Sequence, residues 1–402
     1  GSLEVGSGGT VNFNSGTLTA ALIISGNFSY GFAITPSQLS VRGGDFACLF
    51  PLTLPGNFSW QRGTISGPET LTVRGDVSLG ASSNSLTLDG ATLVFEGTGE
   101  LGANSLLNFR NASHLEVAAG ATFTKTSSAN VIADGPDNEF HNLGTLRFTS
   151  TQNQLWFVPL RNRGRMEVTT TADVNLAAGG DLRQSTVACP AGGDLILNGG
   201  TFRLDGIAYT AAAALAVTGA TVQIDGTEDL PVALTFGPSS TLSGTGTAIF
   251  SGTPPVLNGK IAPGNSPGTL FLGPNLDLDG TTLEMEVTDG GFDQLVVPGD
   301  LQLGGNLRVM ESGTVADGDY LILRCDDVDC LTGNFANTSL PPDYRLDITG
   351  TEVRLIKGAA LPIRWSSFTV ATAGKEHVLR WSTETETNHR GFYVERATDG
   401  EF

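Results

Sequence analysis

Six stretches of this chain repeat one short phrase: an alternating apolar run, a bend of small residues that ends in threonine, and a second alternating run. They read LEVGSGGTVNF from Leu3, LTLDGATLVFEG from Leu86, LEVAAGATFTK from Leu115, LILNGGTFRLDG from Leu195, LAVTGATVQIDG from Leu215 and LDLDGTTLEMEV from Leu276. Side chains alternate across a β-strand, so each phrase predicts two short strands joined at a bend. Such a unit cannot bury its apolar face alone, and a period of roughly 20 residues predicts a solenoid of stacked turns.

Composition and hydrophobic patterning favour the same fold class. Glycine makes up 53 of the 402 residues, only 16% of residues are charged, and no long stretch carries apolar residues at the helical period. Many short strands joined by tight turns have this composition, so we expect an all-β protein. At ~20 residues and ~4.8 Å per turn, roughly 300 residues predict about 15 turns in a rod of roughly 70 Å.

The charge balance excludes some classes of partner. Asp and Glu number 41 against 22 Lys and Arg, which gives a net charge of −19. This charge repels nucleic acid and anionic membrane surfaces, so we expect no nucleic-acid partner. No run of about 18 apolar residues occurs, and we expect no membrane insertion in this segment. No cofactor is expected; loose Ca²⁺ binding stays open, although the carboxylates do not follow the spacing of a calcium loop.

Two of the four cysteines lie close together in sequence. Cys325 and Cys330, in RCDDVDC, can bridge across a small loop, and we expect a structural disulfide. A reduced pair or a metal site is the alternative, which the five-residue offset and the lack of a nearby histidine disfavour. Cys48 and Cys189 stand alone in sequence, and we expect two small buried thiols.

A second recurring signal is an asparagine two places after an apolar residue and just before a strand. FRNASHLEV, FHNLGTLRF and LRNRGRMEV place Asn111, Asn142 and Asn162 in this position. Asparagine adopts the left-handed conformation and can pass amide hydrogen bonds between stacked corners. We therefore interpret these residues as a candidate corner ladder, with three ordinary turn asparagines as the alternative.

From Gly259 the sequence reads GKIAPGNSPGTLFL, followed by an acidic strand and by DQLVVPGDLQLGGNLRV. This order of motifs, over residues 259–356, resembles the late coils of autotransporter passenger regions and related secreted adhesins. The resemblance implies an extracellular, right-handed parallel β-helix, with the repeat region over residues 1–258 and its C-terminal coils over 259–356. It implies no reaction. Pro263 and Pro267 are compatible with a corner there, because proline disfavours helix and central-strand pairing.

Residues 357–361 are expected to form a linker, and residues 362–402 differ in style. WSSFTVATAGKEHVLRWST and GFYVERATDGEF resemble the start of the fibronectin type III-like domain of secreted Bacteroidetes proteins, particularly those exported by type IX secretion. We expect strands at 365–371, 377–382 and 392–396, with Trp381 in the core. A complete domain needs about 90 residues, so the expected fold is a parallel β-helix followed by a truncated β-sandwich. The resemblance also implies secretion or display on a bacterial cell surface.

No catalytic motif stands out. The four histidines, at positions 114, 141, 377 and 389, are too dispersed in sequence to indicate a metal cluster. Parallel β-helices can nevertheless carry polysaccharide lyase or hydrolase sites on an exposed sheet. The weak candidates for a glycan site are an acidic stretch and an arginine-rich stretch about one turn apart: Asp134, Asp137, Glu139, Arg161, Arg163 and Arg165. Surface ion pairs explain the same residues, so we assign no catalytic, cofactor or metal residue and expect no enzyme activity.

The function expected from these patterns is structural or adhesive. A β-helical rod in a large secreted or surface protein would project or build an extracellular appendage or filament, with other protein copies, an extracellular surface or a glycan as partners. The alternative is a polysaccharide-binding or polysaccharide-degrading, lyase-like β-helix protein. Outward threonines, Trp60 and Trp156 could contact sugar, although threonine is common in strands and an aromatic ring usually packs inside.

Overall fold

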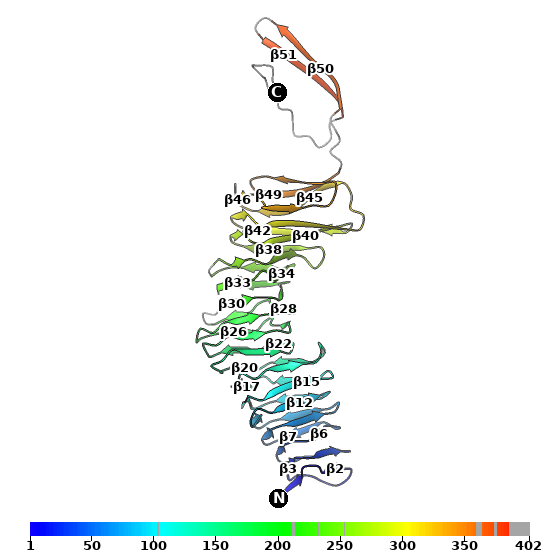
Figure 1. Ribbon diagram of the computed structural model, residues 1–402, viewed down its shortest axis with the longest axis vertical. Helices are drawn as coiled ribbons and strands as arrows, with labels where there is room; N and C mark the ends of the chain where they lie inside the picture. Colours follow the sequence, from blue (N-terminus) through cyan, green and yellow to red (C-terminus); the bar gives the residue numbers. More distant parts are fainter. Residues whose placement is uncertain are drawn as a thin grey trace.

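The computed structural model describes the chain except residues 103, 211–213, 231–232, 253, 359–363, 374–375 and 386–402. The described residues form strands and turns without a helix, and most of them build a parallel β-solenoid of about 14 turns. Figure 1 shows these turns stacked along the long axis of a rod. The predicted all-β solenoid is confirmed, with a number of turns close to the expected one.

Three long parallel sheets form the sides of the rod, and each full turn contributes one strand to each. The first sheet contains β1 (Ser2–Val5), β3 (Ala21–Ile24), β5 (Leu39–Val41), β8 (Phe58–Trp60), β11 (Val77–Leu79), β14 (Thr98–Leu101), β17 (Thr122–Lys125), β20 (Thr145–Phe148), β23 (Arg165–Val168), β26 (Thr186–Ala188) and β29 (Ala208–Tyr209). The second contains β2 (Thr10–Phe13), β4 (Asn27–Tyr30), β6 (Asp45–Ala47), β9 (Gly63–Ser66), β12 (Ser85–Asp89), β15 (Leu106–Arg110), β18 (Val131–Ala133), β21 (Gln154–Phe157), β24 (Val174–Leu176), β27 (Leu195–Leu197), β30 (Ala214–Val217), β33 (Ala233–Phe236) and β36 (Val256–Leu257). The third contains β7 (Leu52–Leu54), β10 (Thr70–Val73), β13 (Thr92–Phe95), β16 (His114–Val117), β19 (Glu139–Asn142), β22 (Leu160–Asn162), β25 (Gly180–Asp181), β28 (Thr201–Arg203), β31 (Thr221–Gln223), β34 (Thr241–Gly244), β37 (Lys260–Pro263), β40 (Thr282–Thr288), β44 (Asn306–Ser312) and β47 (Asn337–Ser339), with β41 (Gly291–Phe292) paired to β40.

Two further sheets replace the first and second sheets toward the C-terminal end. The fourth sheet contains β32 (Thr227–Asp229), β35 (Thr247–Ile249), β38 (Thr269–Gly273), β42 (Gln294–Val297), β45 (Gly318–Cys325), β49 (Glu352–Lys357) and β48 (Tyr344–Ile348). The fifth contains β39 (Leu276–Asp277), β43 (Leu301–Leu303) and β46 (Leu331–Gly333). The third sheet runs unbroken from β34 through β37 to β40, so residues 1–258 and 259–356 share one stack.

The repeated phrase forms the strand–bend–strand unit that its alternation predicts, but at different corners of the rod. In the phrase from Leu86, β12 lies in the second sheet and β13 in the third. In the phrase from Leu115, β16 lies in the third sheet and β17 in the first. The turns also differ in length: stacked Asn12 and Ser29 are 17 positions apart, whereas stacked Ser113 and Asn138 are 25 apart. The phrase is therefore a general corner rather than a marker of one position per turn.

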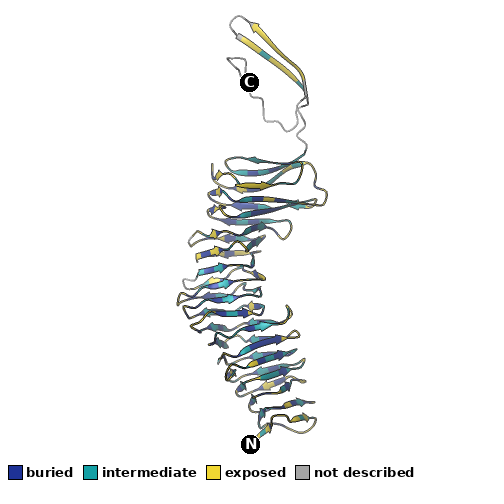
Figure 2. Ribbon diagram, in the orientation of Figure 1, coloured by how far each residue is buried: buried dark blue, intermediate teal, exposed yellow. Residues whose placement is uncertain are grey.

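The interior of the rod is a continuous stack of apolar side chains. Side chains of the same type are often register partners on successive turns. In the third sheet, for example, Leu71, Leu93 and Leu115 lie above one another. The largest rings, Trp60 and Trp156, are buried, which removes them as sugar-stacking platforms. Figure 2 shows buried residues in every part of the rod. Each fully buried side chain of this kind contributes about 1.5–3 kcal/mol, so the core supplies the main favourable term.

Close backbone stacking at one corner requires glycine. Gly44 has a φ of +68°, and a Cβ there would lie 1.8 Å from the carbonyl oxygen of Gly26 on the preceding turn. Gly63 on the next turn is similarly close to the carbonyl oxygen of Gly44. An L-residue at Gly44 would meet both the steric clash and the left-handed backbone, so this corner depends on the absence of a side chain.

The C-terminal end of the rod changes from parallel to antiparallel pairing. Strand β49 pairs antiparallel with β45 on one side and with β48 on the other. Cys325, at the end of β45, forms a disulfide with Cys330, with their Cα atoms 6.1 Å apart; Cys48 and Cys189 are free and buried. Lys357, expected at the start of a linker, instead belongs to β49.

Beyond the rod, β50 (Arg364–Ala373) and β51 (Glu376–Thr385) form an antiparallel hairpin. These strands include the first two expected sandwich strands and extend past their predicted bounds. Trp381, expected in a core, is 37% exposed, because within the described residues this two-stranded sheet has no second layer to cover the ring. The expected third strand, at 392–396, lies outside the described residues.

Candidate functional site

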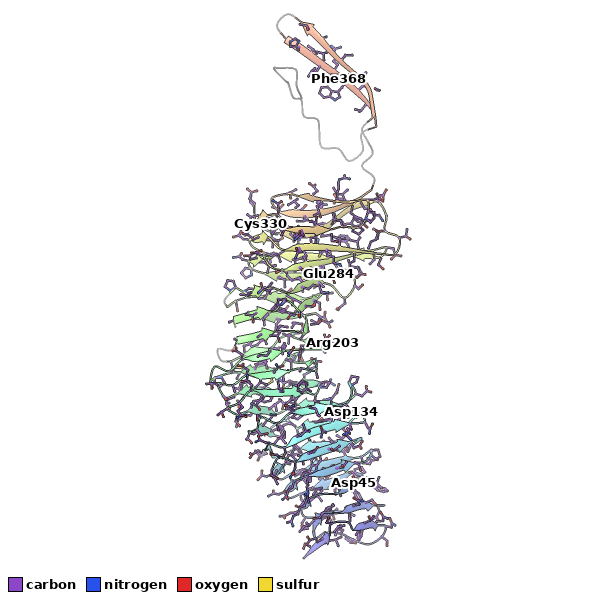
Figure 3. The ribbon with its side chains drawn as sticks, in the orientation of Figure 1. Asp45, Asp134, Arg203, Glu284, Cys330 and Phe368 are labelled. Atoms are coloured by element: carbon purple, nitrogen blue, oxygen red, sulfur yellow. A yellow bond between two sulfur atoms is a disulfide. The ribbon has the colours of Figure 1, made fainter. Side chains whose placement is uncertain are left out.

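The six weak glycan-site candidates do not converge. Asp134 and Asp137 are exposed on the connection before β19, where Asp134 accepts a 2.9 Å hydrogen bond from the amide of Asn138. Figure 3 shows Asp134 at the side of the rod. Glu139 and Arg161 face outward on β19 and β22 of the third sheet and line one shallow groove. Of the six candidates, the structure therefore brings Glu139 and Arg161 to one groove and places the other four elsewhere, because alternation and the corner send them to different faces.

Arg163 and Arg165 are engaged in separate ion pairs. Arg163 donates to both carboxylate oxygens of Asp181, at 2.8 and 2.5 Å, and Arg183 donates to the same two oxygens at 2.9 and 2.8 Å. Although burial alone would raise it, hydrogen bonds from the two arginines hold the pKa of Asp181 well below its usual range. Arg165 donates to Glu167 on the first sheet at 2.5 Å. A doubly clamped carboxylate is a poor general base, so this cluster serves packing between turns.

Two of the three candidate ladder asparagines stack. Asn142 and Asn162 are register partners in the third sheet, both fully buried, and the Asn142 amide donates to Asn162 Oδ1 at 2.6 Å and to the Arg165 carbonyl at 2.9 Å. Asn111 does not belong to this ladder. It lies at the corner between β15 of the second sheet and β16 of the third, has a φ of +53° and donates to Asp89. The register partner of Asn142 on that turn is Val117.

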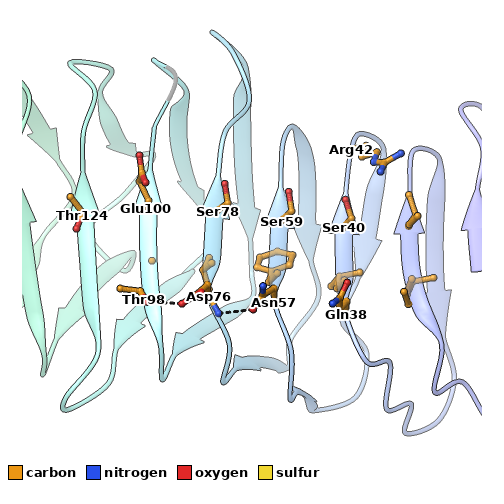
Figure 4. Close-up of a pocket in the computed structure, with 17 residues that line it drawn as sticks. Gln38, Ser40, Arg42, Asn57, Ser59, Asp76, Ser78, Thr98, Glu100 and Thr124 are labelled. Carbon is orange, nitrogen blue, oxygen red and sulfur yellow. Dashed lines mark hydrogen bonds between the residues drawn. The ribbon is translucent and has the colours of Figure 1, made fainter. Parts of the chain in front are cut away.

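A cavity of about 690 Å³ lies on the outer face of the first sheet, between β3 and β17. Its floor carries polar side chains in register on successive strands, as Figure 4 shows: Ser40, Ser59, Ser78, Glu100 and Thr124. Parallel strands place such side chains ~4.8 Å apart. We call this row and the cavity above it the serine groove.

One edge of the serine groove is formed by residues that hydrogen-bond to each other along the rod. Asn57 Oδ1 accepts from the Asp76 backbone amide at 3.1 Å, and Thr98 donates to Asp76 Oδ1 at 2.5 Å. Figure 4 shows Arg42 near the opposite edge. Hydroxyls and amides dominate over charges, so the surface suits a neutral, hydroxyl-rich ligand better than an anionic one. No sequence motif marked this row, because serine at a single outward position is unremarkable until the turns are aligned.

The structure brings together two histidines that the sequence separates. His114 on β16 and His141 on β19 face outward on adjacent turns, with ring centroids 5.7 Å apart, and Glu139 lies beside them. The expectation that the histidines are too dispersed to cluster is wrong for this pair. Stacking of the turns, rather than sequence spacing, makes them neighbours, and knowledge of the register would have identified them.

Two ionisable side chains lie inside the solenoid without exposure to solvent. Lys125 projects inward from β17, and its ammonium donates to the Ser127 carbonyl at 2.6 Å and to Gln154 Oε1 at 3.2 Å. Burial lowers the pKa of Lys125 to about 8. Glu228 on β32 accepts the Ile207 amide at 3.0 Å, and burial raises its pKa to about 7. Both are enclosed by the core rather than open to a groove, so neither is positioned to meet a substrate.

No family model matches the chain, and no curated protein matches its sequence. The class that the structure defines is the parallel β-solenoid. Within the described residues, no helix has the length and apolar character needed to cross a bilayer.

Proposed function

We propose that this chain is a structural or adhesive segment of a large secreted or surface-displayed bacterial protein, in which the solenoid acts as a spacer. The observation that carries the proposal is the continuous apolar core through about 14 turns. Each turn contacts mainly its neighbours, so turns add length without requiring a new core. At ~4.8 Å per turn, the solenoid extends about 65–70 Å.

Several further features support an extracellular setting. The Cys325–Cys330 disulfide is typical of oxidising compartments. The net charge of −19 favours solubility and discourages nucleic-acid binding. The motif order over residues 259–356 resembles secreted adhesins, and residues 362–402 resemble domains of type IX secretion substrates. A protein of this design would place a contact-making segment at a fixed distance from a cell, alone or within a filament.

Removal of whole turns tests the spacer role. Leu146 and Met166 are register partners, so deletion of residues 146–165 removes one turn and joins equivalent positions. In cells that carry the protein, this deletion should leave folding, surface exposure and attachment within about two-fold of the unaltered protein. Deletion of residues 146–155 is the matched control, because it breaks the register and should abolish surface exposure. Loss of attachment in the correctly folded whole-turn deletion would contradict the spacer role.

The serine groove favours a second candidate function, binding of a neutral polysaccharide. An extended chain lying along the rod would meet a polar side chain every ~4.8 Å, from Ser40 to Thr124. Glycan-array binding tests this function. Ser59→Leu should reduce binding at least ten-fold, while Thr72→Leu, at an outward position of the third sheet, should leave it unchanged. Equal glycan binding by both variants would exclude the serine groove as the binding site.

We propose a non-enzymatic role, and the lyase alternative has a direct test. Incubation with a panel of acidic polysaccharides, followed by ultraviolet detection of unsaturated products, would reveal eliminative cleavage. We expect none. Cleavage that disappears in Arg163→Ala, with the fold intact by circular dichroism, would overturn this proposal and reassign the Arg163–Asp181 pair to a reaction.

A further inference from the structure

Three side chains with metal-binding atoms meet on the outer face of the third sheet. His114 and Glu139 are register partners on β16 and β19, and His141 lies two positions beyond Glu139, on the same face. One donor atom from each, an imidazole nitrogen from each histidine and a carboxylate oxygen from Glu139, lies within 4.8 Å of the others. All three side chains are half-buried. They combine a rigid backbone with access from solvent.

The hydrogen bonding within this group is incomplete. His141 Nε2 contacts Glu139 Oε2, whereas the His114 Nδ1 atom is shielded from solvent and makes no hydrogen bond. A buried polar atom without a partner is costly, and the imidazole nitrogen is a ligand atom for first-row transition metals. A cation bound at Nδ1 would give this nitrogen a partner. It would also replace the single contact between His141 and Glu139 with bonds from both side chains to one centre.

The ligand set selects a class of metal. Two imidazoles and one carboxylate are borderline donors that suit Zn²⁺, and also Cu²⁺ or Ni²⁺, better than the all-oxygen ligand sets that Ca²⁺ and Mg²⁺ prefer. Tetrahedral zinc bonds of about 2.0–2.1 Å place ligand atoms roughly 3.3 Å apart. The present limit of 4.8 Å therefore requires a modest side-chain rotation inward and no movement of the strands.

The neighbouring charges are balanced. Glu116, the register partner of His141 on the preceding turn, carries a negative charge, and Arg161, its partner on the following turn, carries a positive one. Arg161 is exposed and can turn toward the adjacent groove, which it lines. The net charge of the surroundings is therefore compatible with a dication whose remaining coordination position faces water.

We propose that His114, Glu139 and His141 form a binding site for one Zn²⁺ ion that links two successive turns of the solenoid. The turn that joins them carries Asp134 and Asp137 and takes 25 residues, as stacked Ser113 and Asn138 show, against 20 from Asn142 to Asn162 on the next turn. An ion bound only by the stacked arrangement stabilises that arrangement by mass action. The ion would therefore hold together two turns at a point where a 25-residue turn is followed by a 20-residue one.

Isothermal titration of the full chain, without an affinity tag, with zinc chloride tests this proposal. We expect one saturable site with a dissociation constant in the micromolar range or below, and no comparable site for Ca²⁺. His114→Gln, His141→Gln and Glu139→Gln should each weaken binding at least ten-fold. His377→Gln, in the β50–β51 hairpin, is the matched control and should leave the affinity unchanged. Zinc should also raise the thermal midpoint of the unaltered chain but not of His114→Gln.

Absence of a saturable zinc site, or unchanged affinity in folded His114→Gln and His141→Gln, would overturn the proposal. If the variants fail to fold, electron paramagnetic resonance of Cu²⁺ bound to the unaltered chain provides an independent reading. Coupling to two imidazole nitrogens supports the site, and coupling to fewer refutes it.

Discussion

Replacement of Lys125 by methionine should reveal how strongly the solenoid interior resists a charge. The ammonium lies in the core of the first sheet, where its register partners are Leu101 and Phe148. Burial lowers the pKa of Lys125 from 10.5 to about 8. Between these values the unfolded chain binds more protons than the folded one, so the stability of the unaltered protein rises with pH in this window.

The size of the pKa shift of Lys125 sets the size of its effect on the free energy of unfolding. At pH 7 the protonated side chain disfavours folding by about 3 kcal/mol, and at pH 10 by about 1 kcal/mol. Lys125→Met removes this term but leaves the Ser127 carbonyl and Gln154 Oε1 without their donor, which costs about 1–3 kcal/mol per group. The net effect at one pH is thus a balance. The lost hydrogen bonds do not affect the change with pH. The stability of Lys125→Met relative to the unaltered chain should therefore fall by about 2–3 kcal/mol from pH 7 to pH 10.

Urea unfolding at several pH values, followed by tryptophan fluorescence, measures this difference. Trp156 is a local reporter, because its ring packs edge-on against Phe148 with centroids 5.7 Å apart. Other titrations occur in both proteins and cancel in the difference. A difference that stays constant within about 1 kcal/mol from pH 7 to pH 10 would refute the reasoning, since it would show that the ammonium is not desolvated.

Three other substitutions test separate features of the solenoid. Burial raises the pKa of Glu228 to about 7, so the unaltered chain loses stability as the pH rises from 4.5 to 8. The stability of Glu228→Gln relative to the unaltered chain should therefore be about 3 kcal/mol greater at pH 8 than at pH 4.5. A difference in urea midpoints that does not change with pH would contradict this. Asn142→Ala should cost about 2–4 kcal/mol, because it removes the donor from the buried Asn162 Oδ1 and from the part-buried Arg165 carbonyl. Asn12→Ala, at an exposed pair, should cost under about 0.5 kcal/mol, and equal losses in urea unfolding would show that the ladder is not a stabilising element. Gly44→Ala should cost more than about 3 kcal/mol, and Gly120→Ala, with similar φ but open space, only about 1 kcal/mol; matching proteolysis rates would disprove the stacking constraint.

Local alternation was enough to predict the fold class but not the register. The phrase from Leu86 contains both strands that the structure has there, because side-chain alternation and a small-residue bend are local properties. Which turn lies above which depends on the length of every connection. Asn111 shows the consequence: its sequence context matches that of Asn142, but it lies at the corner between the second and third sheets, whereas Asn142 lies between the third and the first.

Prediction of the candidate sites depends on the register of the turns even more than prediction of the fold does. Glu139 and Arg161 line one groove, whereas Arg163, two residues further along, forms an ion pair with Asp181. His114 and His141 are far apart in the sequence, and only the stacking of successive turns makes them neighbours. In a solenoid, functional neighbours come from successive turns, so a site becomes visible only once the turns are aligned.

The antiparallel end of the rod has a consequence for how the protein carries tension. In the parallel turns, backbone hydrogen bonds run along the rod axis, so a pull between the two ends would open the turns one after another. A force entering at Lys357 meets β49 first, which is held by β45 on one side and β48 on the other. Two ladders would have to yield together before the first parallel turn is reached. We therefore expect the unfolding force to peak at this end before it falls to the lower, regular level of the individual turns.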